Sequence, residues 1–145
     1  PYVNSYRRLA RHTSAPINIE WGHDNRTVGI RSPLSPASAR RVENRVIGAD
    51  ANPYVALSMT LACGYLGLKH RLQPKAEMKG DAYAAPYALP RSLGEALTLL
   101  REETELHDVL GEAFIQVYTE IKECEFEEFM EVISPWEREH LLLHV

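Results

Sequence analysis

Charged side chains alternate between residues 40 and 45, where the chain reads R-R-V-E-N-R. If this stretch is a β-strand, Arg41, Glu43 and Arg45 share one face and lie about 7 Å apart along it, because every second side chain points the same way. Arginine presents a planar fork that binds carboxylates and phosphates, and a glutamate between two arginines can hold a hard cation beside them. A solvated ladder of salt bridges is the alternative interpretation of an isolated R-x-E-x-R pattern.

The basic residues of the first 45 positions favour an anion-binding pocket over that ladder. Eight basic and three acidic residues give this segment a net charge of +5, whereas the other hundred residues carry −9. A surface that only confers solubility mixes lysine with arginine, and exclusive use of arginine indicates bidentate contacts to anions. All eight basic residues are arginine: Arg7, Arg8, Arg11, Arg26, Arg31, Arg40, Arg41 and Arg45.

The overall composition excludes two classes of partner. A nucleic-acid partner is not expected, because the 145-residue chain is acidic, with a net charge of −4, and its arginines interleave with apolar residues. A membrane partner is not expected either, since no stretch has the roughly 18–20 apolar residues of a membrane span and no signal peptide opens the chain. The length and the 45% hydrophobic content fit one ordinary domain.

Cysteine and histidine positions give no disulfide framework or metal motif. Cys63 and Cys124 lie far apart, and Cys63 is predicted to be a reduced core residue, which indicates a cytoplasmic location. His140 and His144 are one helical turn apart without an HExxH motif, so we interpret them as a frayed helix end. The chain lacks an initial methionine and begins within a pattern, so we expect a piece of a longer protein.

Turn residues separate three predicted strands, at residues 17–21, 27–32 and 40–47. Asp24 or Asn25 is expected to take a left-handed turn position between the first two.

A first helix is predicted from Pro53 to about residue 71, with Asn52 as its N-cap. It is apolar nearly all round, so we expect it in the core. A long loop covers residues 73–91.

The last third reads as amphipathic helix. Ser92 and Glu95 form a predicted capping box, the pattern continues to residue 131, and Ser134 with Pro135 opens a last short helix. The apolar residues expected to face the core are Leu93, Ala96, Leu97, Leu100, Phe114, Val117, Tyr118, Ile121, Phe126 and Phe129.

Four ordered motifs resemble the C-terminal part of the glutamine synthetase catalytic domain: N-S-Y-R-R-L at 4–9, A-P at 15–16, D-N-R-T-V-G-I-R at 24–31 and R-R-V-E-N-R…D-A-N-P-Y at 40–54. The resemblance continues more weakly to residue 145. The stretches W-G-H-D-N-R-T-V-G, G-A-D-A-N-P-Y and P-W-E-R-E-H-L-L-L-H are more similar to the γ-glutamylpolyamine synthetase branch than to ammonia-using enzymes.

This resemblance implies an α+β fold, with a few antiparallel strands and the active-site arginines in residues 1–50, followed by packed helices in a mainly helical part, 51–145. It implies an ATP-dependent ligase that activates the glutamate γ-carboxylate as an acyl phosphate for attack by an amine, here a polyamine such as putrescine. It further implies Mg²⁺ or Mn²⁺ and a dodecamer-like homo-oligomeric ring, in which the leucines at 141–143 are a candidate inter-ring contact.

The resemblance also assigns roles to single residues. Arg8 and Arg45 match arginines that bind the substrate glutamate, and Arg26 matches the catalytic arginine between glutamate and the ATP phosphates.

The nucleotide and metal roles fall on three further positions. Arg31 matches a second phosphate arginine, Arg41 lines the nucleotide site, and Glu43 matches a divalent-metal ligand. Arg41, Glu43 and Arg45 are the row that the strand alternation brings to one face.

Three positions depart from the family pattern. Ser14 replaces the flap glutamate that ammonia-using enzymes carry before A-P, which favours a longer amine as acceptor. Ser38 stands where a lysine often contacts ATP. Tyr83 falls near the tyrosine adenylylated in some bacterial relatives, but its A-Y-A-A-P context differs, so we do not expect regulation there.

Three alternatives stay open: an ammonia-using glutamine synthetase, a non-catalytic relative that keeps the scaffold for assembly, and a free-standing module that binds a nucleotide or acidic metabolite. We also expect the 145 residues alone to be catalytically silent, because one carboxylate cannot build a multi-metal site.

Overall fold

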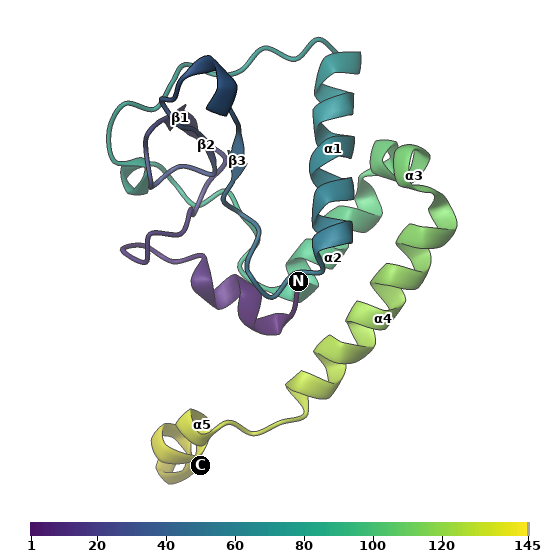
Figure 1. Cartoon of the computed structure of the whole chain (residues 1–145). Coiled ribbons are helices and arrows are strands. Elements are labelled where there is room, and N and C mark those ends of the chain that lie inside the picture. Colours follow the sequence, from purple (N-terminus) through teal and green to yellow (C-terminus); the bar gives the residue numbers. More distant parts are fainter. Residues whose placement is uncertain (145) are drawn as a thin grey trace.

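The computed structural model describes residues 1–144; Val145, the last residue of the predicted domain, lies outside the described residues. A three-stranded sheet lies to one side of a group of helices, which confirms the α+β class (Figure 1). The elements follow in the order η1 (Val3–Arg8), β1 (Trp21–His23), β2 (Ile30–Ser32), η2 (Ala37–Ala39), β3 (Glu43–Asn44), α1 (Pro53–Lys69), η3 (Ala82–Ala84), α2 (Leu93–Glu102), α3 (Thr104–Leu110), α4 (Glu112–Met130), α5 (Pro135–Leu141) and η4 (Leu142–His144).

The sheet has the order β1-β2-β3. β2 and β3 pair antiparallel, with Arg31 opposite Glu43. β1 and β2 pair parallel, so the prediction of antiparallel strands was wrong for this ladder. The reason is the turn after β1: Asp24 takes the left-handed position, with φ of 46°, and the chain then returns so that Ile30 lies beside Trp21.

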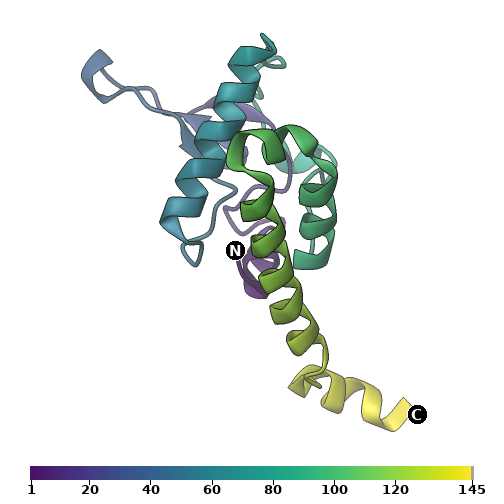
Figure 2. The ribbon, with the colours of Figure 1, turned by 90° about the vertical axis from the view of Figure 1, so that its right-hand side faces the viewer.

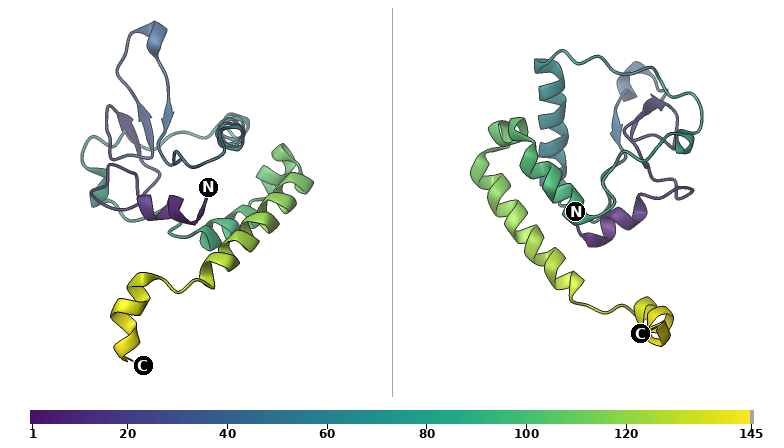
Figure 3. Two further views of the ribbon diagram at one scale, coloured as in Figure 1. Left: turned by 60° about the horizontal axis from the view of Figure 1, so that its bottom comes forward. Right: turned by 180° about the vertical axis from the view of Figure 1, so that it is seen from behind.

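All three strands are shorter than predicted, because much of the expected strand backbone pairs with loops. The carbonyl of Ile17, for example, accepts from the N–H groups of Ala88 and Leu89 at 2.9 and 3.3 Å. Between β2 and β3, residues 33–42 project from the sheet and carry η2 at their tip (Figures 2 and 3). The sheet is therefore short, and hydrogen bonds to loops replace part of the expected strand pairing.

α1 begins as predicted. The side chain of Asn52 accepts from the N–H groups of Tyr54 and Val55, and Pro53 occupies the first turn. Its expected burial was wrong. Among the residues of α1, only Ala62 is buried, and Leu61 is 72% exposed. Other exposed apolar side chains of this helix are Tyr54, Leu57, Tyr65 and Leu68.

Cys63 is exposed and its thiol is free, which corrects its predicted core position. Burial of an apolar helix requires apolar surface on every side, and the 144 described residues provide it on one side only.

The predicted amphipathic region, residues 92–131, is divided into α2, α3 and α4. Glu103 ends α2, and Gly111, with φ of 93°, separates α3 from α4. Ser92 caps α2 by accepting from the N–H of Glu95 at 3.1 Å. The reciprocal bond of the predicted capping box is displaced by one residue, because the Glu95 carboxylate accepts from the N–H of Arg91.

The core face of α4 differs from the predicted stripe. Leu93 and Leu97 of α2 are buried as expected, and α2 packs against α4. In α4 the buried residues are Ile115 and Thr119. Four side chains predicted to face the core are exposed instead: Phe114, Val117, Ile121 and Phe129.

α5 stands away from the other elements (Figures 1 and 3). It begins with the predicted Ser134, whose hydroxyl accepts from the N–H of Glu137 in a complete capping box. His140 stacks on Trp136 with ring centroids 4.8 Å apart, as part of the helix end. No group of three potential metal-binding His, Cys, Asp or Glu side chains occurs within residues 1–144. Over the same range, every helix is too short or too polar to cross a membrane.

Candidate active site

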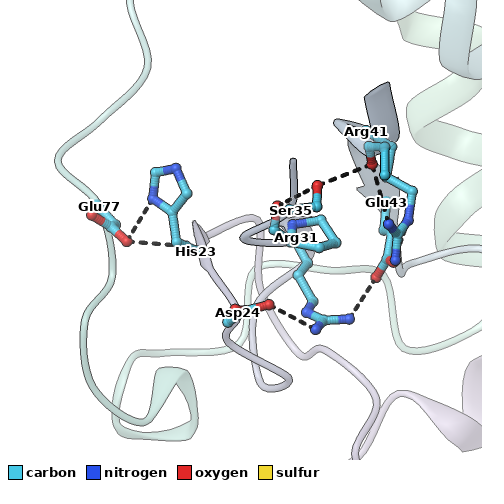
Figure 4. A network of polar contacts seen from close by, with 9 residues as sticks. His23, Asp24, Arg31, Ser35, Arg41, Glu43 and Glu77 are labelled. Carbon is cyan, nitrogen blue, oxygen red and sulfur yellow. Dashed lines mark hydrogen bonds and ion pairs between the residues drawn. The ribbon is translucent and has the colours of Figure 1, made fainter. Parts of the chain in front are cut away.

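The antiparallel register places Arg31 and Glu43 side by side, and their side chains meet. Nη1 of Arg31 donates to Oε2 of Glu43 at 3.0 Å, and Nη2 donates to Oδ1 of Asp24 at 2.9 Å. Nε of Arg41 donates to the other oxygen of Glu43 at 3.1 Å. Figure 4 shows the resulting chain of ion pairs, which we call the Glu43 network: Asp24, Arg31, Glu43 and Arg41.

Electrostatics keep Glu43 ionised. Partial burial raises its pKa, but hydrogen bonds from Arg31 and Arg41 outweigh that effect, so the pKa of Glu43 lies below its ordinary value. The bond that Arg31 donates to Glu43 also raises the pKa of Arg31. Only 18% of the Arg31 side chain is exposed, compared with 54% of Arg41. Arg41 is therefore the arginine of the network that is more open to a ligand from solvent.

Arg45 does not continue the predicted row. β3 ends at Asn44, and although the N–H of Arg45 still donates to the carbonyl of Gly29 at 2.9 Å, the ion pairs of Glu43 are with Arg31 and Arg41. The Arg45 guanidinium turns to two backbone carbonyls, and its Nη2 donates to Ser14 at 2.6 Å and to Arg26 at 2.7 Å. The prediction that Arg41, Glu43 and Arg45 share a face holds for the first two residues only.

Arg8 lies against the Arg45 backbone. Its guanidinium donates to the carbonyl oxygens of Arg45 and Val46, which fixes η1 beside the end of β3. Arg26 lies in the turn between β1 and β2, and its side chain is exposed. The predicted glutamate-binding residues are thus linked through backbone carbonyls: Arg8 donates to the carbonyl of Arg45, and Arg45 donates to the carbonyl of Arg26.

Three predicted site arginines carry an unsatisfied donor. The Nε atoms of Arg8, Arg31 and Arg45 are buried and lack a hydrogen-bond partner within residues 1–144. A buried donor without a partner costs about 1–3 kcal/mol. Concentration of such donors in the predicted site is the pattern expected where acceptors come from another molecule or another part of a protein.

A divalent cation fits this site only in part. Both oxygens of Glu43 are already bonded to arginines, and Asp24 is the nearest further carboxylate of the network. Mg²⁺ requires about six oxygen ligands in octahedral geometry. Glu43 is a suitable single ligand, and the remaining ligands must come from water, a phosphate or other residues.

Several contacts of the site have no local signal in the sequence. Asp24 bonds to Arg31 seven residues later, at the end of the parallel ladder. Glu77 accepts from both the backbone N–H and Nδ1 of His23. Tyr83 is buried, and its hydroxyl donates to the carbonyl of Ala15 at 3.0 Å.

Comparison with known proteins identifies the family. The sequence-family model for the glutamine synthetase catalytic domain matches residues 1–141. The chain belongs to the glutamine synthetase catalytic-domain family. It spans about a third of the length of the curated relatives that it matches.

Relatives with different acceptors in their names are similar to this chain to nearly the same degree. A glutamate–isopropylamine ligase of a Pseudomonas species is 38% identical, over 94% of this chain and 31% of the relative. A glutamine synthetase of Thermococcus kodakarensis is 37% identical, over 92% and 32%. A gamma-glutamylputrescine synthetase of Escherichia coli is also 37% identical, over 98% and 30%. The family is therefore established, and identity does not distinguish its branches.

Solved structures agree with this family assignment. The structure titled as the ADP complex of GmaS superimposes with a TM-score of 0.84 at 28% identity, over 98% of this chain and 34% of that one. The ligand-free GmaS structure gives a TM-score of 0.82 at 30% identity, over 98% and 33%. The fold of this chain is thus the fold of about one third of a larger family member.

Proposed function

We propose that this chain is the C-terminal part of the catalytic domain of an ATP-dependent ligase, which joins the γ-carboxyl group of glutamate to an amine through γ-glutamyl phosphate. The Glu43 network carries this proposal. Phosphoryl transfer to a carboxylate concentrates negative charge, and catalysis consists largely of positioning cations around it. Arg31 and Arg41 are such cations, and the ionised Glu43 between them can serve as one metal ligand.

The residues divide between the substrates as follows. Arg8, Arg26 and Arg45 bind glutamate, and Arg26 is the catalytic arginine that also reaches the ATP phosphates. Two of these arginines have a buried, unpartnered Nε, which supports a ligand contact after a small movement. Arg45 must release at least one carbonyl to bind a carboxylate with its fork.

ATP and its metal are assigned to the Glu43 network. Arg31 and Arg41, with Arg26, bind the phosphates, and Glu43 is one ligand of Mg²⁺ or Mn²⁺. When bound, the metal neutralises phosphate charge. Arg41, the more exposed partner of Glu43, is the residue that can move to a phosphate and free an oxygen of Glu43.

For the acceptor we propose an amine larger than ammonia, in particular a polyamine such as putrescine. Ser14 replaces a carboxylate that would shield and deprotonate ammonium, and it lies beside Arg45. Relatives named for isopropylamine, ethanolamide and putrescine match this chain at 34–38% identity. Ammonia is the alternative acceptor, because relatives named glutamine synthetase match equally well.

We further propose that the full-length enzyme is a cytoplasmic homo-oligomeric ring, and that the 145 residues alone do not catalyse the reaction. Among the described residues no group of three potential metal ligands occurs, and Glu43 is the one carboxylate of the site that we assign to the metal. The exposed leucines that follow α5, Leu142 and Leu143, are candidates for a contact between rings. Truncation after Arg138 tests this contact, because an unchanged oligomer would exclude it.

An ADP-release assay on the full-length enzyme that carries this segment tests the ligase and its acceptor. Glutamate is combined in turn with ammonia, ethanolamine, isopropylamine, putrescine and spermidine. We expect release that depends on both glutamate and an amine, with highest kcat/KM for a polyamine. A preference for ammonia would overturn the acceptor assignment, and release independent of glutamate would overturn the ligase.

A further inference from the structure

The segment of residues 10–16, which we call the Ser14 loop, has a strained backbone. His12 and Ser14 have φ of 64° and 59°, in the left-handed region that side chains with a Cβ rarely adopt. Such residues persist where surrounding contacts over-determine their conformation. The local contact is Thr13, whose hydroxyl donates to the carbonyl of Ala10 at 2.6 Å.

Tyr83 supplies most of the long-range contacts of this loop. Its hydroxyl donates to the carbonyl of Ala15 at 3.0 Å, and both groups are buried. Its own carbonyl accepts from the guanidinium of Arg11. Its ring lies 5.7 Å from the ring of His12. One residue, about 70 positions away in the sequence, thus touches the loop at its beginning, middle and end.

Tyr83 is itself rigidly held. It lies in η3, where Asp81 accepts from its N–H at 2.9 Å. The neighbouring Ala82 donates its N–H to the hydroxyl of Thr27 at 2.9 Å and accepts from the buried amide of Asn18 at 2.8 Å. η3 is therefore anchored to the turn between β1 and β2.

These bonds form a closed circuit through the candidate site. Arg45 joins the carbonyl of Ser14 to the carbonyl of Arg26. From Ser14 the chain leads to Ala15, whose carbonyl is bonded to Tyr83. From η3 the Thr27 bond leads back to the residue beside Arg26. Tyr83 and its neighbour Ala82 are thus bonded to the residues that follow both carbonyls bound by Arg45.

We propose that Tyr83 is a positioning residue, whose hydroxyl holds the Ser14 loop against Arg45. For the acceptor amine, this proposal rests on the proposed function, in which Ser14 replaces the carboxylate that would shield and deprotonate ammonium. Without the hydroxyl, the loop relaxes its left-handed residues, and Arg45 loses a fixed acceptor. This role differs from that of an adenylylated tyrosine, because Tyr83 is only 6% exposed.

Hydrogen exchange on the full 145-residue chain tests the structural part of the proposal. Tyr83→Phe removes only the hydroxyl, and we expect amides of residues 13–15 to exchange about fivefold faster, with α2 and α4 unchanged. Tyr87→Phe is the matched control, since this tyrosine lies in the same segment, is 37% exposed, and has the guanidinium of Arg11 over its ring, which phenylalanine keeps; it is expected to leave residues 13–15 unchanged. Equal exchange in Tyr83→Phe and the parent chain would overturn the proposal.

A second variant covers the case in which Tyr83→Phe does not fold. Arg11→Gln removes the donor to the Tyr83 carbonyl and retains the tyrosine hydroxyl. Because the hydroxyl bond to Ala15 remains, we expect exchange at residues 13–15 to stay within about twofold of the parent chain. A fivefold or larger increase would show that the Arg11 contact, and not the hydroxyl of Tyr83, holds the loop.

Kinetics of the full-length enzyme separate positioning from a purely structural role. We expect Tyr83→Phe to raise KM for the amine about fivefold, with KM for ATP within about twofold of the parent enzyme. Equal changes of both constants would contradict the positioning role. Absence of γ-glutamyl amide formation by the parent enzyme would instead contradict the proposed function, and it leaves the exchange result interpretable.

Discussion

Polar contacts between side chains and exposed apolar side chains lie in different parts of the chain. We call residues 1–50 the strand half and residues 53–144 the helical half. In the strand half, Glu43 accepts from Arg31 and Arg41, and Arg45 donates to two carbonyls. In the helical half, large apolar side chains face solvent: Tyr54, Leu57, Leu61, Tyr65 and Leu68 of α1, with Phe114, Val117 and Ile121 of α4. A cavity of about 620 Å³ lies between η1, α1, α2 and α4.

The difference shows which part of the structure this chain determines by itself. Ion pairs and hydrogen bonds form between groups a few ångströms apart, so a short sheet suffices to orient them. Burial of an apolar helix needs a large complementary surface. A polar site that forms without its surrounding apolar contacts fits our proposal that this chain is one part of a larger catalytic domain.

The largest expected effect is a loss of kcat/KM, and it is tested by comparing one arginine from each half. Arg31→Lys in the full-length enzyme keeps the charge but loses the fork that joins Asp24 to Glu43, and we expect kcat/KM to fall about 10²–10³-fold. Arg101 also binds a carboxylate, that of Glu123, in the helical half. Steady-state kinetics of Arg101→Lys are expected to stay within about twofold of the parent enzyme. Equal losses in both variants would show that the Glu43 network has no special role.

The second prediction compares a buried leucine with an exposed one. In the 145-residue chain, Leu93→Ala removes a side chain that is 1% exposed, and we expect a loss of about 2–5 kcal/mol of unfolding free energy. Leu57 of α1 is 64% exposed, and Leu57→Ala is expected to change stability by less than about 0.5 kcal/mol. Urea unfolding measures both. A loss above about 2 kcal/mol for Leu57→Ala would mean that α1 is buried in the isolated chain.

The smallest expected effect is a change of the melting temperature with pH, caused by His107. Nδ1 of His107 lies 2.9 Å from Glu112 and Nε2 lies 2.9 Å from the carbonyl of Leu100, and both partners are acceptors. A neutral imidazole has one N–H, so both bonds require the charged ring. The bond to Leu100 and the Glu112 carboxylate raise the pKa of His107.

The sign of the pH effect follows from this raised pKa. The stabilisation is complete below the ordinary value of about 6.5 and is lost as pH rises through the raised folded value. We expect the melting temperature of the chain to decline over this window, and the decline to be smaller in His107→Gln. Identical pH profiles for the two proteins would contradict the assignment.

Local signals in the sequence predicted the parts of the fold that depend on neighbouring residues. Asn52 and Pro53 start α1, Ser92 starts α2, and Arg41 meets Glu43 two residues later, each through contacts within a few positions. These interactions need no knowledge of the remaining chain.

Predictions failed where distant contacts decide the outcome. The turn that leads into the parallel pairing of β1 and β2 is held by bonds from Asn25 to the carbonyls of Met78 and Gly80, more than 50 positions away. Arg45 leaves the predicted row because its guanidinium donates to the distant carbonyls of Ser14 and Arg26. Whether Cys63 is exposed depends on whether another apolar surface packs against its helix, α1. The periodicity of apolar residues predicts which side chains prefer burial. It does not predict whether a surface that can bury them is present.

Glutamate-dependent ADP release by the full-length enzyme with Glu43→Gln tests the proposed site most directly. The substituted amide would keep the shape of the side chain but lose the charge that binds the metal and both arginines, and we predict a loss of at least about 10²-fold. Glu77→Gln is the matched control, because Glu77 also accepts hydrogen bonds from a neighbouring residue, His23, beside the same sheet. Activity of Glu43→Gln equal to that of the Glu77→Gln control would contradict an active site built on Glu43.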